Sequence, residues 1–165
     1  MSRRLLIPLV TVIAVLGVSV GLATAFVSGP HIKAEGTETF ERNALIQSTF
    51  RWSPELVQVP SGGTIKFSSE TLGGDPHTIS VVRQGERPST VEEVFNCTIC
   101  NTIFNKLDGN TVYDPGNDGL NAPLDTWLLF TGQKLTLTVS APAGTKLYFM
   151  CAIHPWMQGI IDVTS

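Results

Sequence analysis

The sequence predicts an all-β protein, a β-sandwich into which one helix is inserted. Several short segments alternate apolar and polar residues with period two, which is the spacing of half-buried strands. Fifteen glycines and ten prolines provide the many turns that a fold of short strands needs. A chain of 165 residues is expected to form one compact domain.

The composition excludes two classes of protein. Hydrophobic residues make up 42% of the chain and charged residues only 15%, which excludes a disordered, highly charged chain. The formal net charge is -3, so the chain lacks the basic surface that nucleic-acid binding requires. We therefore expect no nucleic-acid partner.

The N-terminal residues 1–28 have the pattern of a signal peptide or a membrane anchor. Arg3 and Arg4 precede an uncharged apolar run, residues 5–27, and this order places the N-terminus in the cytoplasm. Residues 23–25 read Ala-Thr-Ala, a site for signal peptidase, but the run is also long enough to span a bilayer uncleaved. Both outcomes stay open, and both predict an extracytoplasmic protein (periplasm or cell surface), either secreted or membrane-anchored.

The remaining chain divides into a polar N-terminal segment and a region of predicted strands. Residues 29–45 show no clear period, and we interpret them as a linker or N-terminal arm before a sandwich domain at residues 46–165. Within that domain the apolar residues alternate between Gly- and Pro-rich turns. The segments that we interpret as strands are residues 56–60, 64–68, 77–82, 134–139, 147–150 and 159–163.

One segment has helical spacing instead. Ser89 and Glu92 form a capping box, which is typical of a helix start, and apolar residues then recur every four positions. We predict a helix over about residues 90–106, followed by a Gly/Asn/Asp-rich loop, so that residues 84–126 form an insertion. The apolar residues of this helix are Val91, Phe95, Ile99 and Ile103.

A set of metal-ligating side chains stands near the C-terminus. Cys151, His154 and Met157 fall within seven residues at the end of a predicted strand, and His77 begins an earlier strand. Two imidazoles, a thiolate and a weak thioether are the ligands of a blue-copper electron-transfer site. A histidine or methionine alone is more often structural. The +3 and +6 spacing with a distant histidine is hard to obtain by chance, so we predict one type 1 copper ion.

In these segments the chain resembles the cupredoxins. Residues 54–67, 75–82 and 147–157 follow the family's order along the chain, and the resemblance covers roughly residues 50–83 and 127–165. The short C-x2-H-x2-M spacing is closest to that of amicyanin. The resemblance implies a Greek-key β-sandwich with copper at one end, and it says nothing about the insertion. The implied copper ligands are His77, Cys151, His154 and Met157.

The resemblance also implies a function. It predicts a mononuclear copper protein, not an enzyme, that carries single electrons between redox proteins outside the cytoplasmic membrane. The ligand thiolate is expected to accept backbone N–H bonds near Thr78. His154 is expected nearer the surface, where Pro155 and Trp156 would form an apolar patch for electron entry. The alternative is a copper-binding or copper-delivery protein of the same fold.

Two further cysteines form a C-x-x-C pair in the predicted helix. For Cys97 and Cys100 we expect a disulfide, because thiols outside the cytoplasm are not kept reduced. A thioredoxin-type redox centre is a weaker alternative, since no βαβ unit surrounds the pair. A zinc site would need two more ligands, which no nearby residue supplies.

Overall fold

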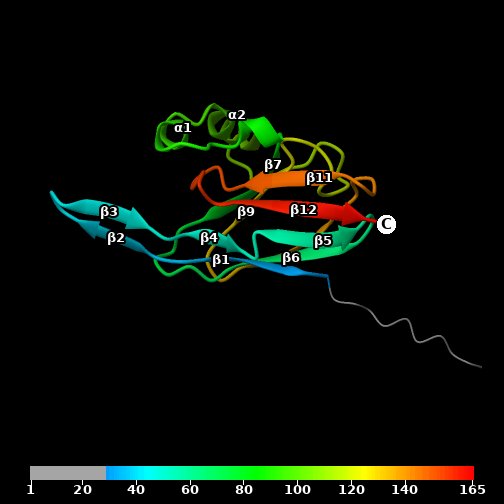
Figure 1. Ribbon diagram of the computed structural model, residues 1–165, viewed down its shortest axis with the longest axis horizontal. Helices are drawn as coiled ribbons and strands as arrows, with labels where there is room; N and C mark the ends of the chain where they lie inside the picture. The colour runs from blue at the N-terminus through cyan, green and yellow to red at the C-terminus, as the bar shows by residue number, and fades with distance from the viewer. Residues whose placement is uncertain (1–28) are drawn as a thin grey trace, which may run out of the picture.

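The computed structural model describes residues 29–165 (Figure 1). The signal peptide or anchor predicted for residues 1–28 lies outside the described residues. Within residues 29–165, no helix is both long and apolar enough to cross a membrane.

Two sheets form the body of the protein. One consists of β1 (His31–Glu35), β4 (Arg51–Ser53), β6 (Thr64–Ser69) and β10 (Lys134–Thr138). The other consists of β5 (Leu56–Pro60), β7 (His77–Val82), β8 (Val112–Tyr113), β9 (Thr126–Leu129), β11 (Lys146–Met150) and β12 (Gln158–Thr164). The strand orders are β10-β6-β1-β4 and β5-β12-β11-β7-β9-β8.

The two sheets face each other across one apolar core. Phe67 from the first sheet and Phe149 from the second are fully buried, with ring centroids 5.6 Å apart in an edge-to-face contact. The chain crosses between the sheets from β5 to β6 to β7, and again from β9 to β10 to β11. These crossings confirm the predicted Greek-key β-sandwich, and the six predicted strands correspond to β5, β6, β7, β10, β11 and β12.

The expected linker at residues 29–45 is instead largely strand. β1 pairs in parallel with β6 and antiparallel with β4, so it is a central strand of its sheet. Its burial alternates, but only Ile32 and Ala34 face the core. Two apolar residues, one of them a small alanine, are too weak a pattern to predict a strand.

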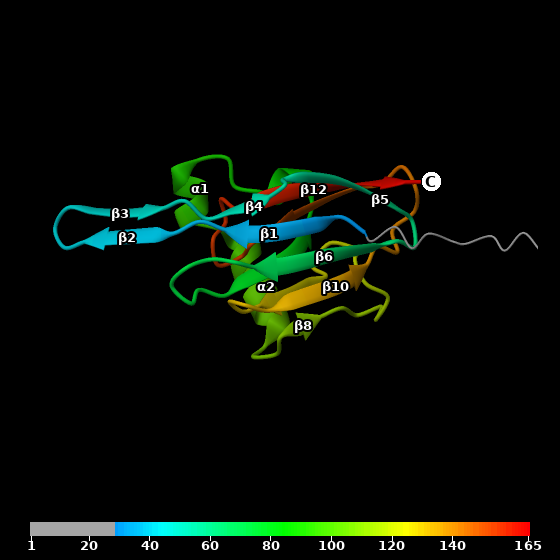
Figure 2. The same cartoon turned by 90° about the horizontal axis from the view of Figure 1, so that it is seen from below.

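A hairpin of β2 (Glu38–Glu41) and β3 (Leu45–Ser48) projects from one end of the sandwich (Figures 1 and 2). Phe40 and Ile46 are paired across it and are 72% and 79% exposed. At its base, the Thr49 backbone N–H donates to the Thr37 carbonyl oxygen (2.9 Å). The hairpin therefore presents an apolar pair to solvent at the end of the sandwich where β11 ends and β12 begins.

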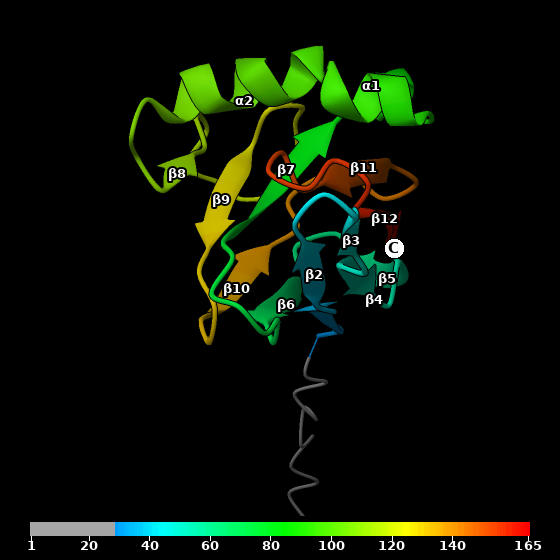
Figure 3. The ribbon, with the colours of Figure 1, turned by 90° about the vertical axis from the view of Figure 1, so that its left-hand side faces the viewer.

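The inserted helical segment is two helices, not one. α1 (Val91–Phe95) and α2 (Thr98–Leu107) are separated at Asn96 and Cys97, and Figure 3 shows both lying across the outer face of the six-stranded sheet. The capping box is formed by Thr90 and Glu93, one residue later than predicted. A 3₁₀ helix, η1 (Gln84–Glu86), precedes α1.

Only α2 buries an apolar face. Ile103 and Leu107 pack with Val82 and Met150 of the sheet below, whereas Val91 of α1 is 72% exposed. The fourfold apolar spacing therefore predicted burial correctly for α2 but not for α1, because Asn96 and Cys97 interrupt the helix between them.

Changing Ile103→Ala should destabilise the protein. The side chain is fully buried, so its loss leaves a cavity under α2 and should lower the free energy of unfolding by about 2–5 kcal/mol. The exposed Val91→Ala, as a control, should change it by less than about 0.5 kcal/mol. Urea unfolding followed by circular dichroism measures both. Equal losses in the two variants would contradict the packing of α2 on the sheet.

Candidate metal centre

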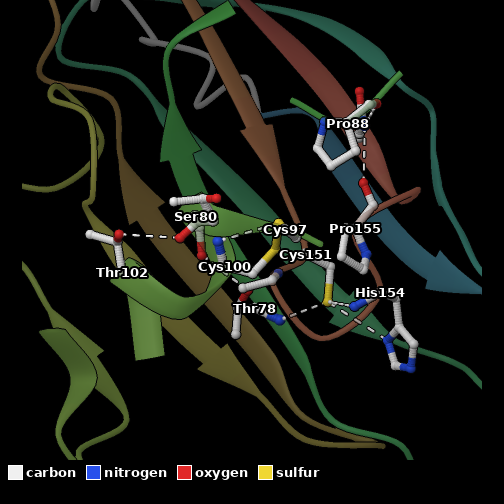
Figure 4. Close-up of a disulfide and its surroundings, with 12 residues drawn as sticks. Thr78, Ser80, Pro88, Cys97, Cys100, Thr102, Cys151, His154 and Pro155 are labelled. Atoms are coloured by element: carbon white, nitrogen blue, oxygen red, sulfur yellow. Dashed lines mark hydrogen bonds between the residues drawn. A yellow bond between two sulfur atoms is a disulfide. The ribbon is translucent and has the colours of Figure 1, made fainter. Parts of the chain in front are cut away.

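Three of the four predicted ligands meet at one end of the sandwich. His77 begins β7, Cys151 follows the last residue of β11, and His154 lies in the ligand loop, residues 151–157, between β11 and β12. Their ligand atoms all lie within 4.8 Å of one another, and all three residues are buried. Figure 4 shows Cys151 and His154 side by side. β7 and β11 are neighbours in the sheet, which brings these distant residues together.

The distances among the three donor atoms suit one metal ion. Cys151 Sγ lies 3.9 Å from His77 Nδ1 and 3.7 Å from His154 Nδ1, and the two Nδ1 atoms are 3.2 Å apart. The point equidistant from all three is about 2.1 Å from each, close to the lengths of metal–nitrogen bonds (about 2.0–2.1 Å) and metal–sulfur bonds (about 2.3 Å). Two imidazoles and one thiolate in a three-cornered arrangement fit a type 1 copper ion.

Backbone hydrogen bonds close the ligand loop into a tight turn. The Cys151 N–H donates to the Met157 carbonyl oxygen (2.9 Å), and the Met157 N–H donates to the His154 carbonyl oxygen (2.8 Å). These bonds hold Cys151 and His154 on the same side of the loop. Met157 is buried at the end of this turn, and its role as the axial ligand stays a prediction.

The cysteine sulfur accepts two backbone hydrogen bonds. The N–H groups of Thr78 and His154 each donate to Cys151 Sγ at 3.3 Å, which confirms the contact expected near Thr78. The Thr78 hydroxyl in turn accepts from the Ala152 N–H (2.7 Å) and from the Ser80 hydroxyl (3.0 Å). β7 thereby fixes the sulfur in place and stabilises negative charge on it.

Burial sets the protonation of the ligands. It lowers the pKa of His77 from 6.5 to about 4, helped by the neighbouring His154. Burial likewise lowers the pKa of His154, against an opposing effect of Asp75. Burial raises the pKa of the Cys151 thiol, although the N–H bonds to its sulfur act in the opposite direction. The imidazoles are thus neutral and ready to bind a metal, while the thiolate needs a cation beside it.

A hydroxyl orients the first imidazole. Thr71 Oγ1 lies 3.3 Å from His77 Nε2, and both side chains are buried. If Nε2 carries the proton and donates to Thr71, Nδ1 is left with a free lone pair facing Cys151 and His154. This is how protein metal sites commonly fix the tautomer of a histidine ligand.

Aromatic rings frame the two imidazoles. The Phe50 ring stands edge-on to His77 (5.4 Å between centroids) and to His154 (4.9 Å). The Trp52 ring contacts His77 from another side, at 5.9 Å. The Trp156 indole N–H donates to the Phe50 carbonyl oxygen (3.1 Å), tying the ligand loop to the base of the hairpin. Sequence reasoning missed Phe50 and Trp52 because nothing local links them to the distant ligands.

The expected electron-entry patch is only half exposed. Trp156 is 41% exposed and packs against His154, with ring centroids 5.3 Å apart. Pro155 is instead buried, which corrects the expectation that it lies in a surface patch. The Gln158 side-chain amide donates both to the Pro155 carbonyl oxygen (3.0 Å) and to that of Pro88 (2.7 Å), so the insertion is held against Pro155.

The cysteines divide as the sequence predicts. Cys97 and Cys100 form a disulfide, with Cα atoms 5.3 Å apart, and Cys151 is a free thiol (Figure 4). The disulfide packs in one apolar cluster with Met150 and Ala152, the two neighbours of Cys151. The insertion therefore touches the metal-binding segment directly.

The chain is similar to known proteins in structure but not in sequence. No family model and no curated protein sequence matches the chain. The crystal structure of dithionite-reduced auracyanin from Roseiflexus castenholzii matches with a TM-score of 0.51 and 19% identity, covering 84% of this chain and 98% of that one.

Two other solved structures are similar in part. A purple cupredoxin from Nitrosopumilus maritimus has a TM-score of 0.46 and 15% identity, covering 82% of this chain and all of its own. Amicyanin from Paracoccus versutus has a TM-score of 0.41 and 12% identity, covering 86% of each chain. The auracyanin match shows that the two chains share a fold.

Metal affinity should rise with pH through the neutral range. The metal-free thiol of Cys151 has a raised pKa and is protonated there, whereas both imidazoles are already neutral. Binding of Cu(I) must then displace the thiol proton, so affinity should increase about tenfold per pH unit between roughly pH 6.5 and 8. Competition with a chelator of known pH dependence measures this slope. A flat profile would mean that the thiol is ionised before the metal binds.

Proposed function

We propose that this chain, which has the cupredoxin fold, binds one type 1 copper ion through His77, Cys151 and His154 and carries single electrons. The observation that carries this proposal is the convergence of one buried thiol and two buried imidazoles within 4.8 Å. When bound, copper would supply a one-electron couple at this point. Met157 is proposed as the weak axial ligand, from its place in the ligand loop.

The donor set favours copper over zinc. Structural zinc sites are closed by four strong ligands in a tetrahedron, whereas the described residues bring three such ligands together here. A single thiolate with two imidazoles is the set that type 1 copper uses. The thiolate suits Cu(I), and imidazole is acceptable to both oxidation states.

The protein around the ligands is built to hold one geometry. Thr71 fixes the His77 ring, Phe50 packs on both imidazoles, and the Thr78 and His154 N–H groups fix the sulfur. None of these groups needs to move when the charge at the centre changes by one. A frame of this kind keeps the reorganisation that accompanies electron transfer small.

Electrons are proposed to enter and leave beside Trp156. This side chain is exposed and contacts His154, so a partner that covers it comes near a copper ligand without displacing one. The projecting β2–β3 hairpin stands at the same end of the sandwich and offers Phe40 and Ile46 as additional contact surface. The partners would be redox proteins outside the cytoplasmic membrane, a location supported by the apolar N-terminal run that could also anchor the chain.

The alternative function is delivery of copper to another protein. Delivery requires the metal to pass between ligand sets, which is easiest when ligands are exposed. All three ligands here are buried, which favours a carrier that retains its copper. We assign no enzymatic reaction to the chain, because multicopper enzymes need more histidines than the three in this sequence. A reversible one-electron wave with retained copper would support the carrier, and ready loss of Cu(I) would support delivery.

Changing Cys151→Ser should abolish the colour of the Cu(II) protein. The intense visible band of a type 1 site arises from charge transfer between the thiolate and copper, and a serine hydroxyl is not a soft anionic ligand at neutral pH. Absorption spectra of the two Cu(II)-loaded proteins measure the effect. If the variant kept the band, Cys151 would not be the copper ligand.

Changing Met157→Leu should keep the copper but raise the reduction potential, since loss of the thioether removes electron donation that stabilises Cu(II). Met150→Leu is the matched control, because Met150 is equally buried but packs under α2. Voltammetry of the three proteins measures the shift. A potential that is unchanged by Met157→Leu would identify Met157 as a packing residue only.

A further inference from the structure

We propose that the Cys97–Cys100 disulfide is a thiol–disulfide exchange site, reduced by a dithiol of a partner protein. This site does not depend on copper, so it stands or falls separately from the electron-carrier function. It rests on where the two sulfurs lie, what they contact and how little the disulfide is needed to hold the fold.

The disulfide lies in a groove that opens to solvent. The groove has a volume of about 290 Å³, and both Cys97 and Cys100 line it, although the two residues are only 9% and 4% exposed. Phe95 and Phe104 from the helices and Trp156 from the ligand loop also line it, and they are 83%, 43% and 41% exposed. A partner that inserts apolar side chains between these rings would bring its own thiols to the disulfide.

The backbone around Cys97 favours a thiolate there. Cys97 is the residue that caps the start of α2, and its Sγ accepts a hydrogen bond from the Cys100 backbone N–H (3.3 Å). This hydrogen bond and the positive end of the α2 dipole would both stabilise negative charge on the Cys97 sulfur after reduction. C-x-x-C pairs in which the first cysteine starts a helix are reactive for this reason.

The fold has little need of this disulfide. It joins residues only three apart in sequence, so it restricts the unfolded chain much less than a disulfide that closes a long loop. Ile103 and Leu107 already hold α2 on the sheet by burial. Opening the disulfide should therefore leave the protein folded, as a reversible exchange site requires.

The exchange reaction balances with one dithiol. A partner thiolate attacks Cys97 Sγ, which belongs to the more exposed of the two cysteines (9% against 4%), the Cys97–Cys100 bond breaks, and Cys100 leaves as a thiolate that takes up a proton. The partner's second thiolate then attacks the mixed disulfide and releases Cys97, whose sulfur keeps the Cys100 N–H bond. Two electrons pass from the partner dithiol to this chain, and the partner becomes a disulfide.

The groove also joins this site to the metal-binding loop. Ala152 and Ile153, which follow Cys151, line the groove beside the disulfide. A partner held there would contact the ligand loop on its outer side, whereas Cys151 itself is completely buried. The geometry brings a thiol partner close to the copper loop without giving it access to the copper ligand.

The first experiment compares reduction in the folded and unfolded protein. The Cu(I)-loaded protein is incubated with dithiothreitol in the absence of oxygen, and the exchange is stopped with acid. The protein is then denatured, its free thiols are alkylated, and its mass is measured by mass spectrometry. One alkylated cysteine means an intact disulfide, and three mean a reduced one. We expect the folded protein to be reduced at least as fast as the urea-unfolded protein, with its circular dichroism unchanged. Reduction at least a hundredfold slower in the folded protein would overturn the proposal.

The second experiment tests the groove, with reduced thioredoxin as the protein dithiol. Phe95→Ala should slow reduction by thioredoxin several-fold and leave reduction by dithiothreitol unchanged. Leu56→Ala, an exposed apolar residue on β5, is the control and should change neither rate. Reduced thioredoxin whose second, resolving cysteine is replaced by serine should attack the intact disulfide and stay joined to Cys97, while Cys100 leaves as a thiol; peptide mapping by mass spectrometry locates the mixed disulfide. Equal rates for Phe95→Ala and Leu56→Ala, or trapping on Cys100 alone, would overturn the proposed groove and mechanism.

Discussion

The hydrogen bonds between Thr78 and the ligand loop are the constraint on which the metal centre depends. In the β7–β11 pair, Met150 lies opposite Ser80, and Cys151 is the first residue after β11. There the Thr78 N–H donates its hydrogen bond to the Cys151 sulfur and not to a carbonyl oxygen. The Thr78 hydroxyl accepts a hydrogen bond from the Ala152 N–H. The sheet register therefore places the Cys151 thiol beside His77, the residue that precedes Thr78. A slip of one residue would turn the alternate side chains to the opposite face and separate the ligands.

The parts of this site that the sequence predicts are those with local signals. The ligands Cys151 and His154 are three residues apart, and His77 opens a short segment rich in β-branched residues, so each belongs to a pattern that a short window contains. Phe50 is different. It contacts both imidazoles only because β1 lies between β4 and β6, and that pairing places the residues before Trp52 at the metal end. β1 itself carries too few apolar residues to be found without its neighbours.

The interruption of the inserted helix escaped prediction for a related reason. Fourfold spacing from Val91 to Ile103 is what one straight helix would show, but the helix is interrupted at Cys97, whose backbone is extended and which starts a second helix and forms its disulfide. α2 then buries Ile103, while α1 leaves Phe95 facing solvent. The burial of Pro155 follows from the same segment, because Gln158 holds the Pro88 carbonyl beside it. The apolar spacing shows which residues of a helix could be buried. Which of them are buried depends on how the helix packs in the tertiary fold.

The two kinds of sulfur chemistry in this chain are kept apart by one residue. Ala152 donates its N–H to Thr78 on the copper side and packs with the Cys97–Cys100 disulfide on the other. Cys151 is completely buried, and burial raises the pKa of its thiol, so without a metal it is a poor nucleophile and out of reach of an incoming dithiol. Cys97 lies at the start of a helix in an open groove, where a thiolate is stabilised. The groove reaches Cys97 and Cys100 but not Cys151, so a partner that exchanges with the disulfide would leave the copper ligand untouched.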